Sequence, residues 1–93
     1  MDDNIVKTTL AEAKVFIEGE KSGSVIYRLI KDDINGYEAY SIAIESLLDG
    51  QTETEYLEDV SRDPGEAEEL IFLLARNTVT PDTALYVMED LLS

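Results

Sequence analysis

Carboxylate side chains are concentrated between Thr52 and Leu74, where their type and spacing could support chemistry. Eight acids fall in this stretch against one basic residue, Arg62. Paired carboxylates can transfer protons at a glycosidic bond, ligate hard metal ions such as Mg²⁺ or Ca²⁺, or attract a basic surface. The acids are Glu53, Glu55, Glu58, Asp59, Asp63, Glu66, Glu68 and Glu69.

Catalysis is the least expected of these uses. The sequence has no histidine and no cysteine, which removes the commonest general base, the commonest metal ligand and thiolate chemistry. Carboxylate pairs act as acid and base only in a cleft that raises one pKa. A calcium loop with Gly36 in sixth position would put Lys31 first and Ile42 twelfth, where acids are required. We therefore expect no enzyme, no metal site and no cofactor.

The negative charge is unevenly distributed along the chain. The net charge is −14, residues 1–31 hold five acids and five bases, and residues 32–93 have only Arg62 and Arg76 as bases. This exceeds the magnitude of about 2–8 that solubility requires of a small domain. Such a field opposes binding to nucleic acid or an anionic membrane, and it speeds encounter with a basic partner. A basic protein surface is the expected partner.

Length and composition predict one folded domain over residues 1–93. Hydrophobic residues make up 44% of the chain, enough to form a core. No apolar run approaches the roughly 20 residues of a membrane helix, and the first residues do not resemble a signal peptide. A cytoplasmic protein is expected.

The first half of the chain alternates apolar and polar residues, as strands do. Thr9–Glu18 is predicted as a strand, although a helix over Thr9–Glu20 competes because its residues have good helix propensity. Glu18–Gly23 is a predicted turn. Ser24–Lys31 has apolar residues on both faces and is expected to be a central strand.

Two further strands follow. Asp32–Gly36 is predicted to close a hairpin, since Asn-Gly accepts positive φ at both positions. Tyr37–Ser46 alternates again, and Leu47–Gly50 turns the chain. Thr52–Val60 is predicted as a charged edge strand. Its expected faces are Glu53, Glu55, Leu57 and Asp59 on one side, and Thr54, Tyr56, Glu58 and Val60 on the other.

A helix is predicted to begin after Asp63. Asp63 is a candidate N-cap, Pro64 suits the first helical position, and Glu66 has the spacing of a capping box. Asn77 can end this helix. The residues expected to face the sheet are Ala67, Leu70, Ile71 and Leu74.

Thr80-Pro81 predicts a second helix. Its apolar stripe is Ala84, Leu85, Met88, Leu91 and Leu92, and its other side is Asp82, Tyr86, Glu89 and Asp90. Four antiparallel strands followed by two helices predict an α+β fold, a meander sheet with both helices on one face. The pattern leaves open which face they cover.

Phe72 lies about 150° from the centre of the first helix's apolar stripe. Cover by the second helix or a loop is the first expectation. The alternative is an exposed aromatic anchor among acids, which would add affinity to a charged binding surface. Tyr56 and Tyr86 raise the same question less strongly.

Several short motifs resemble a group of small bacterial domains of unknown function from anaerobic Gram-positive species. The resemblance covers residues 24–93 and implies four strands and two helices, but no activity. The motifs are Tyr37-x-x-Tyr40-Ser41-Ile42-Ala43-Ile44, Val60-Ser61-Arg62-Asp63, Leu70 with Asn77, Thr80-Pro81 and Val87-Met88-Glu89-Asp90-Leu91-Leu92.

In size, acidity and lack of catalytic residues the chain is also similar to phage-encoded inhibitors of bacterial defence, including anti-CRISPR proteins and DNA mimics. This similarity implies that carboxylates replace phosphates in the basic channel of a nucleic-acid-binding nuclease or effector. Acids on every second residue of a strand would lie about 6.6 Å apart. The candidate partner-binding residues are Glu53, Glu55, Glu58, Asp59, Glu66, Glu69 and Phe72.

A second hypothesis is a regulatory or structural interaction module without nucleic-acid mimicry. Such a module would bind through the open face of the sheet or as a homodimer. A dimer that buries Val25, Ile26 or Tyr27 would favour this class.

Overall fold

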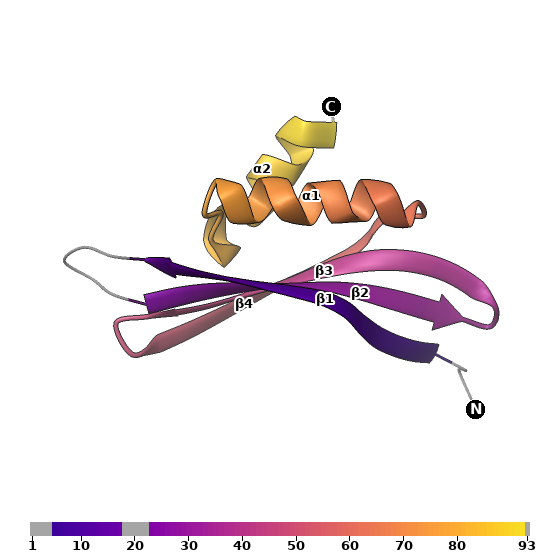
Figure 1. The fold of residues 1–93 in the computed structure, drawn as a ribbon, viewed down its shortest axis with the longest axis horizontal. Coiled ribbons are helices and arrows are strands. Elements are labelled where there is room, and N and C mark those ends of the chain that lie inside the picture. The colour runs from indigo at the N-terminus through magenta and orange to yellow at the C-terminus, as the bar shows by residue number, and fades with distance from the viewer. Residues whose placement is uncertain (1–4, 18–22, 93) are drawn as a thin grey trace.

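The computed structural model describes residues 5–17 and 23–92. Its elements are β1 (Ile5–Ile17), β2 (Gly23–Ile34), β3 (Tyr37–Leu48), β4 (Gln51–Ser61), α1 (Pro64–Arg76) and α2 (Pro81–Leu92). Within these residues the strands form one antiparallel sheet in the order β1-β2-β3-β4, and the helices lie on one face of it (Figure 1). The predicted α+β meander is confirmed. The competing prediction of a helix over Thr9–Glu20 is wrong, because Ile5–Ile17 form a strand.

Two-residue turns connect the last three strands. Asn35 and Gly36 have φ of 53° and 85°, and the flanking Ile34 and Tyr37 are paired. The β3–β4 turn repeats this geometry, with φ of 56° and 79° at residues 49 and 50. Positive φ at both central positions matches the twist of the strands. The turn predicted at Glu18–Gly23 falls, except for Gly23, outside the described residues.

The core lies between the helices and the sheet face that carries the odd-numbered residues of β2 and their partners in register on β3. Val25, Tyr27 and Leu29 of β2 are buried there, as expected for a central strand. The Tyr27 hydroxyl donates a hydrogen bond of 2.7 Å to the Val79 carbonyl oxygen, which ties the sheet to the loop between the helices. The remaining core residues are Tyr40, Ile42, Ile44, Leu57, Ala67, Leu70, Ile71, Leu74, Val79, Ala84 and Met88.

The ends of α1 follow the predicted signals with one difference. The Asp63 carboxylate accepts a hydrogen bond from the Gly65 N–H at 3.1 Å, so Asp63 is the N-cap. The Asp63 N–H donates to the Ser61 hydroxyl at 3.0 Å. The Ser61 hydroxyl therefore accepts the hydrogen bond from the Asp63 N–H that the capping-box prediction assigned to the Glu66 side chain. Asn77 is the C-cap, as predicted.

The apolar stripe of α2 is narrower than predicted. Ala84 and Met88 are buried, but Leu85 is 55% exposed, so its prediction as a core residue is wrong. α2 packs chiefly over the edge strand β4, which offers it a narrow apolar surface. Asp82, Tyr86, Glu89 and Asp90 are exposed, as expected. The side chains of Leu91 and Leu92 fall outside the described part of the structure.

Both outer strands contain an irregularity in register. In β1 the register shifts between Thr9 and Ala11. In β4 the residues between Leu57 and Ser61 face the step from Ile42 to Tyr40 on β3. Bulges of this kind bend an edge strand and break its alternation.

No helix in the described residues is long and apolar enough to span a membrane.

Candidate partner-binding surface

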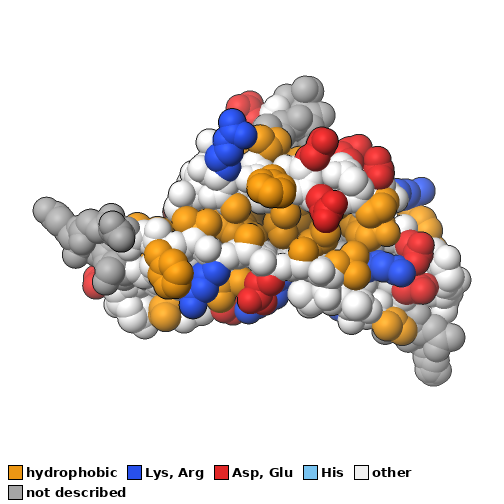
Figure 2. Space-filling view, in the orientation of Figure 1, with side chains coloured by type: hydrophobic (Ala, Val, Ile, Leu, Met, Phe, Trp, Pro, Cys, Tyr) orange, Lys and Arg blue, Asp and Glu red, His pale blue; other side chains and the backbone are white. Residues whose placement is uncertain are grey.

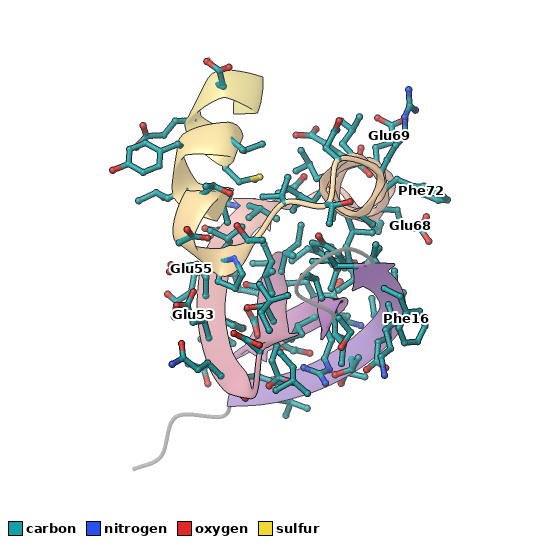
Figure 3. All side chains as sticks on the ribbon, turned by 90° about the vertical axis from the view of Figure 1, so that its left-hand side faces the viewer. Phe16, Glu53, Glu55, Glu68, Glu69 and Phe72 are labelled. Carbon is teal, nitrogen blue, oxygen red and sulfur yellow. The ribbon has the colours of Figure 1, made fainter. Side chains whose placement is uncertain are left out.

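The acids of β4 occupy an edge of the sheet. Glu53 and Glu55 pair with Ser46 and Ile44 of β3, on the helix-covered face. Both side chains lie beside α2 (Figure 3). The regular alternation ends at Leu57, which is buried.

The irregularity in β4 changes the position of Asp59. Its φ is 49°, and its N–H donates to the Ser41 hydroxyl at 3.1 Å. The regular alternation of Glu53, Glu55 and Leu57 therefore does not extend to Asp59. Of the predicted acids at every second residue, only Glu53 and Glu55 form such a pair.

A groove with an apolar floor and an acidic rim separates β4 from α2. Its volume is about 420 Å³. Leu57 and Met88 are buried at its base, and the exposed Leu85 borders it. The acids that line this groove are Glu55, Glu58, Asp59 and Glu89.

A second hollow continues the acidic surface toward the β3–β4 turn. Its volume is about 430 Å³, and Asp49, Glu53 and Asp82 are among its lining residues. We call the surface formed by both hollows the β4–α2 surface. The acids that line them are Asp49, Glu53, Glu55, Glu58, Asp59, Asp82 and Glu89.

Basic side chains do not compensate the β4–α2 surface. β4 and α2 contain seven acids and no lysine or arginine. Within the described residues, the carboxylates of Glu53, Glu55, Glu58 and Glu89 form no ion pair. The ion-paired bases of the described chain are on the first two strands: Lys7 with Asp32, Arg28 with Glu12 and Glu45, and Lys31 with Glu38.

The three remaining predicted residues lie elsewhere. Figure 3 shows Glu69 and Phe72 on α1, on the opposite side of the molecule from Glu53 and Glu55. Glu66 belongs to the first turn of the same helix. Phe72 is 74% exposed, so the expectation that another element covers it is wrong. The structure thus divides the predicted residues between two surfaces.

Two exposed apolar side chains of α2 are not among the predicted partner-binding residues. The sequence pattern places Leu85 in the apolar stripe of the second helix and indicates Tyr86 only as a possible anchor. They are 55% and 73% exposed. The helical spacing placed Tyr86 correctly on the outer side of α2, but it did not show that Leu85 borders the groove.

A polar cluster on the open face of the sheet was also missed. Asp32 is 5% exposed. Its carboxylate accepts hydrogen bonds from Ser41 at 2.6 Å, Lys7 at 3.1 Å and Tyr56 at 3.3 Å. Each of these residues comes from a different strand. Tyr56 is therefore a member of this cluster, which we call the Asp32 cluster, and not a free anchor.

Opposing effects act on the pKa of Asp32. Burial of the carboxyl raises its pKa. The hydrogen bonds from Ser41 and Lys7 and the positive charge of Lys7 lower the pKa by more than burial raises it, so the pKa of Asp32 lies below its usual range. Hydrogen bonds with Tyr56 and Asp32 raise the pKa of Lys7. The cluster is thus stabilised in its charged form.

In the described residues, no three carboxylates are grouped so that they could hold a metal ion.

Comparison with known proteins yields a family but no described relative. No curated protein matches the chain, and no solved structure matches it. One family model, described as a family of unknown function (DUF6514), matches residues 6–93. The chain therefore belongs to the DUF6514 family.

Proposed function

We propose that this protein is a non-enzymatic inhibitor that occupies the basic surface of a nucleic-acid-binding effector. In this proposal it acts in the manner of anti-CRISPR and DNA-mimic proteins, with carboxylates in the place of phosphates. It binds protein and not nucleic acid, and it needs no cofactor.

The observation that carries the proposal is the uncompensated β4–α2 surface. The acids of β4 and α2 that line this surface repel one another, and within the described residues none of them forms an ion pair with a lysine or arginine; they are Glu53, Glu55, Glu58, Asp59, Asp82 and Glu89. This arrangement destabilises the free protein. A lysine- and arginine-rich surface would supply the missing countercharges.

Charge and apolar contact have separate roles in this mechanism. The acids attract the partner over a distance and raise the association rate. Leu85 lines the groove and is 55% exposed, so it can be desolvated on contact, which lowers the dissociation rate. The regular pair Glu53 and Glu55 accounts for only part of the charge, so the proposal depends on the acidic surface as a whole.

The acids of α1 form a separate region. Glu69 and Phe72 lie on the opposite side of the molecule from Glu53 and Glu55 (Figure 3), and Glu66 belongs to the first turn of the same helix. We therefore assign the main contact to the β4–α2 surface. The α1 acids provide a matched control.

The test begins with capture of partners on the immobilised protein from a bacterial lysate that contains nuclease effectors, with and without competing duplex DNA. Affinity for a captured effector is then measured for two charge-reversal variants. One carries Glu53→Lys, Glu55→Lys and Glu89→Lys. The control carries Glu66→Lys, Glu68→Lys and Glu69→Lys, which changes the net charge equally.

We expect duplex DNA to displace the captured effector and binding to weaken steeply with salt. The β4–α2 variant should lose at least about 100-fold in affinity, because close charge pairs at interfaces contribute about 1.5–7 kcal/mol each. The α1 control should lose only a few-fold. Equal losses would show that the surface is misassigned. Capture that DNA does not affect would favour an interaction module without mimicry.

A further inference from the structure

The edge of the sheet opposite the β4–α2 surface exposes hydrophobic side chains. β1 is an outer strand, and Leu10 and Phe16 on it are 49% and 72% exposed. Phe72 of α1 projects above the same edge (Figure 3). Figure 2 shows hydrophobic side chains gathered along the line between α1 and the sheet. An exposed apolar edge is a template for pairing with another strand.

A shallow groove runs between β1 and α1. Its volume is about 260 Å³, and Ala11, Ala13, Ile71, Phe72 and Ala75 form its apolar lining. The small alanine side chains leave the backbone of β1 accessible from this side. β1 pairs only with β2 among the described strands, so its outer backbone groups have no strand partner there.

Charge distribution favours a second copy of this chain as the occupant. Residues 1–31 are neutral overall, and the −14 arises from the rest of the sequence. Two copies that met at their β4 edges would bring Glu53 and Glu55 against their equivalents. Two copies that meet at β1 keep their acidic surfaces at opposite ends, beyond the roughly 8 Å over which charges interact at physiological salt.

Among pairings centred on residues 12–14, the charges of β1 favour one register. Directly opposed residues of an antiparallel pair point to the same face of the sheet. In a symmetric pair of identical strands, the two-fold axis must therefore pass between one residue and its equivalent in the other copy. An axis at Glu12 or at Lys14 opposes that charge to itself. An axis at Ala13 places Glu12 of each copy opposite Lys14 of the other, within the regular part of β1 that follows the irregularity at Leu10. Opposite charges and apolar pairs across strands stabilise a sheet, whereas like charges oppose it.

From these observations we infer that the protein forms a symmetric dimer in which two β1 strands pair about Ala13, joining both sheets into one. The pairing uses the edge opposite the β4–α2 surface. It therefore goes beyond the proposed function and does not depend on it.

The helix layer fits the same axis. α1 packs chiefly over β2, and its smallest contact with the sheet is with β1. Across the new pairing the two β2 strands are three strand spacings apart, about 14 Å. Phe72 and Ala13 line the same groove, so an axis at Ala13 would bring the two Phe72 side chains toward the gap between the helices. Glu68 and Arg76 lie four residues to either side of Phe72, and the two-fold axis places each opposite the other.

The test uses a charge swap in the full chain. The mass of the wild-type protein is measured by sedimentation velocity over a range of concentrations in about 150 mM salt. The same measurement is made on a Glu12→Lys variant, a Lys14→Glu variant, an equimolar mixture of the two, and the double variant. Glu55→Lys on the other edge is the control.

We expect the wild type and the Glu55→Lys control to dimerise. Each single β1 variant should dimerise at least about tenfold more weakly, because one brings lysines together and the other glutamates. The mixture and the double variant should recover dimers, because both restore the Glu–Lys pairs. This recovery also shows that the single variants are folded.

Three results would overturn the inference. The first is a wild type that stays monomeric at about 100 μM, the range of a weak specific dimer. The second is single variants that dimerise as well as the wild type, which would move the interface elsewhere. The third is a mixture of the single variants that contains only monomers.

Discussion

Replacing Asp32 by asparagine removes the charge from the Asp32 cluster while it keeps the size of the side chain. The amide can still accept one hydrogen bond, but its NH₂ group faces donors. Ser41, Lys7 and Tyr56 all donate to Asp32 in the native protein. We therefore expect Asp32→Asn to fold and to be less stable.

The size of the effect follows from the contacts. The bond from the buried Ser41 to a charged acceptor contributes about 1.5–3 kcal/mol. The Lys7 side chain is 52% exposed, so its ion pair adds only about 0–1 kcal/mol. The free energy of unfolding should thus fall by about 2–4 kcal/mol, which for a domain of this length lowers Tm by roughly 10–30 °C.

The effect should depend on pH in one direction. Because the pKa of Asp32 is lowered by folding, its contribution is complete above the ordinary value of about 3.9 and is lost as the pH falls through the folded pKa. Urea unfolding from pH 7 to pH 2.5, at one protein concentration, should show a constant difference between wild type and variant that shrinks below about pH 4.

Glu53→Gln provides the control, since it makes the same charge change at an exposed residue of the described chain without an ion pair. It should leave stability within about 0.5 kcal/mol of the wild type. Our account of the Asp32 cluster would be refuted if both variants were equally stable at pH 7. A difference that stayed constant down to pH 2.5 would refute the assigned ionisation.

Other predictions concern the core, a turn and the net charge. Leu74→Ala should cost about 2–5 kcal/mol in urea unfolding, because Leu74 is fully buried; a loss below about 1 kcal/mol would contradict its place in the core. Burial raises the pKa of Tyr27 to about 12, so Tyr27→Phe should remove the last tyrosine to ionise in an alkaline absorbance titration, and the wild type should lose stability as the pH rises above about 10. An unchanged titration would show that Tyr27 is not buried. Gly36→Ala should lower stability by about 1–2 kcal/mol because φ there is +85°, and an unchanged Tm would argue against the two-residue turn. Adding NaCl should raise the wild-type Tm by screening the −14 net charge, whereas a fall would show that attractive pairs dominate.

The order and type of the elements were predictable because their signals are local. Alternation over a few residues defines a strand, Asn35-Gly36 defines its turn, and Asp63 with Pro64 marks the start of α1. Each signal acts within one or two turns of chain. None requires knowledge of a distant residue.

The irregularities in the strands were not predictable in the same way. The β4 irregularity depends on the Ser41 hydroxyl, which accepts the Asp59 N–H from another strand. The sequence pattern places Asp32 in the turn before Gly36. In the structure β2 continues through Ile34, so Asp32 lies within the strand. Its partners Lys7 and Tyr56 are brought to it only by the pairing of the complete sheet.

The candidate surface was predictable in composition and not in extent. The acids of β4 and the first turn of α1 adjoin in sequence, which suggested one surface. The placement of α1 over the β1 side and α2 over the β4 side separates Glu69 from Glu55 (Figure 3). Helix packing, which the sequence pattern did not specify, thus decides which acids act together.

The uneven placement of charge has a consequence for motion before contact. Residues 1–31 are neutral while the rest of the chain holds the whole excess, so the centre of charge is displaced from the centre of mass. A positive surface exerts a torque on such a body and rotates it during approach. The molecule should arrive with β4 and α2 foremost and with β1 turned toward the solvent. Its orientation is then selected in solution, which reduces the number of unproductive collisions.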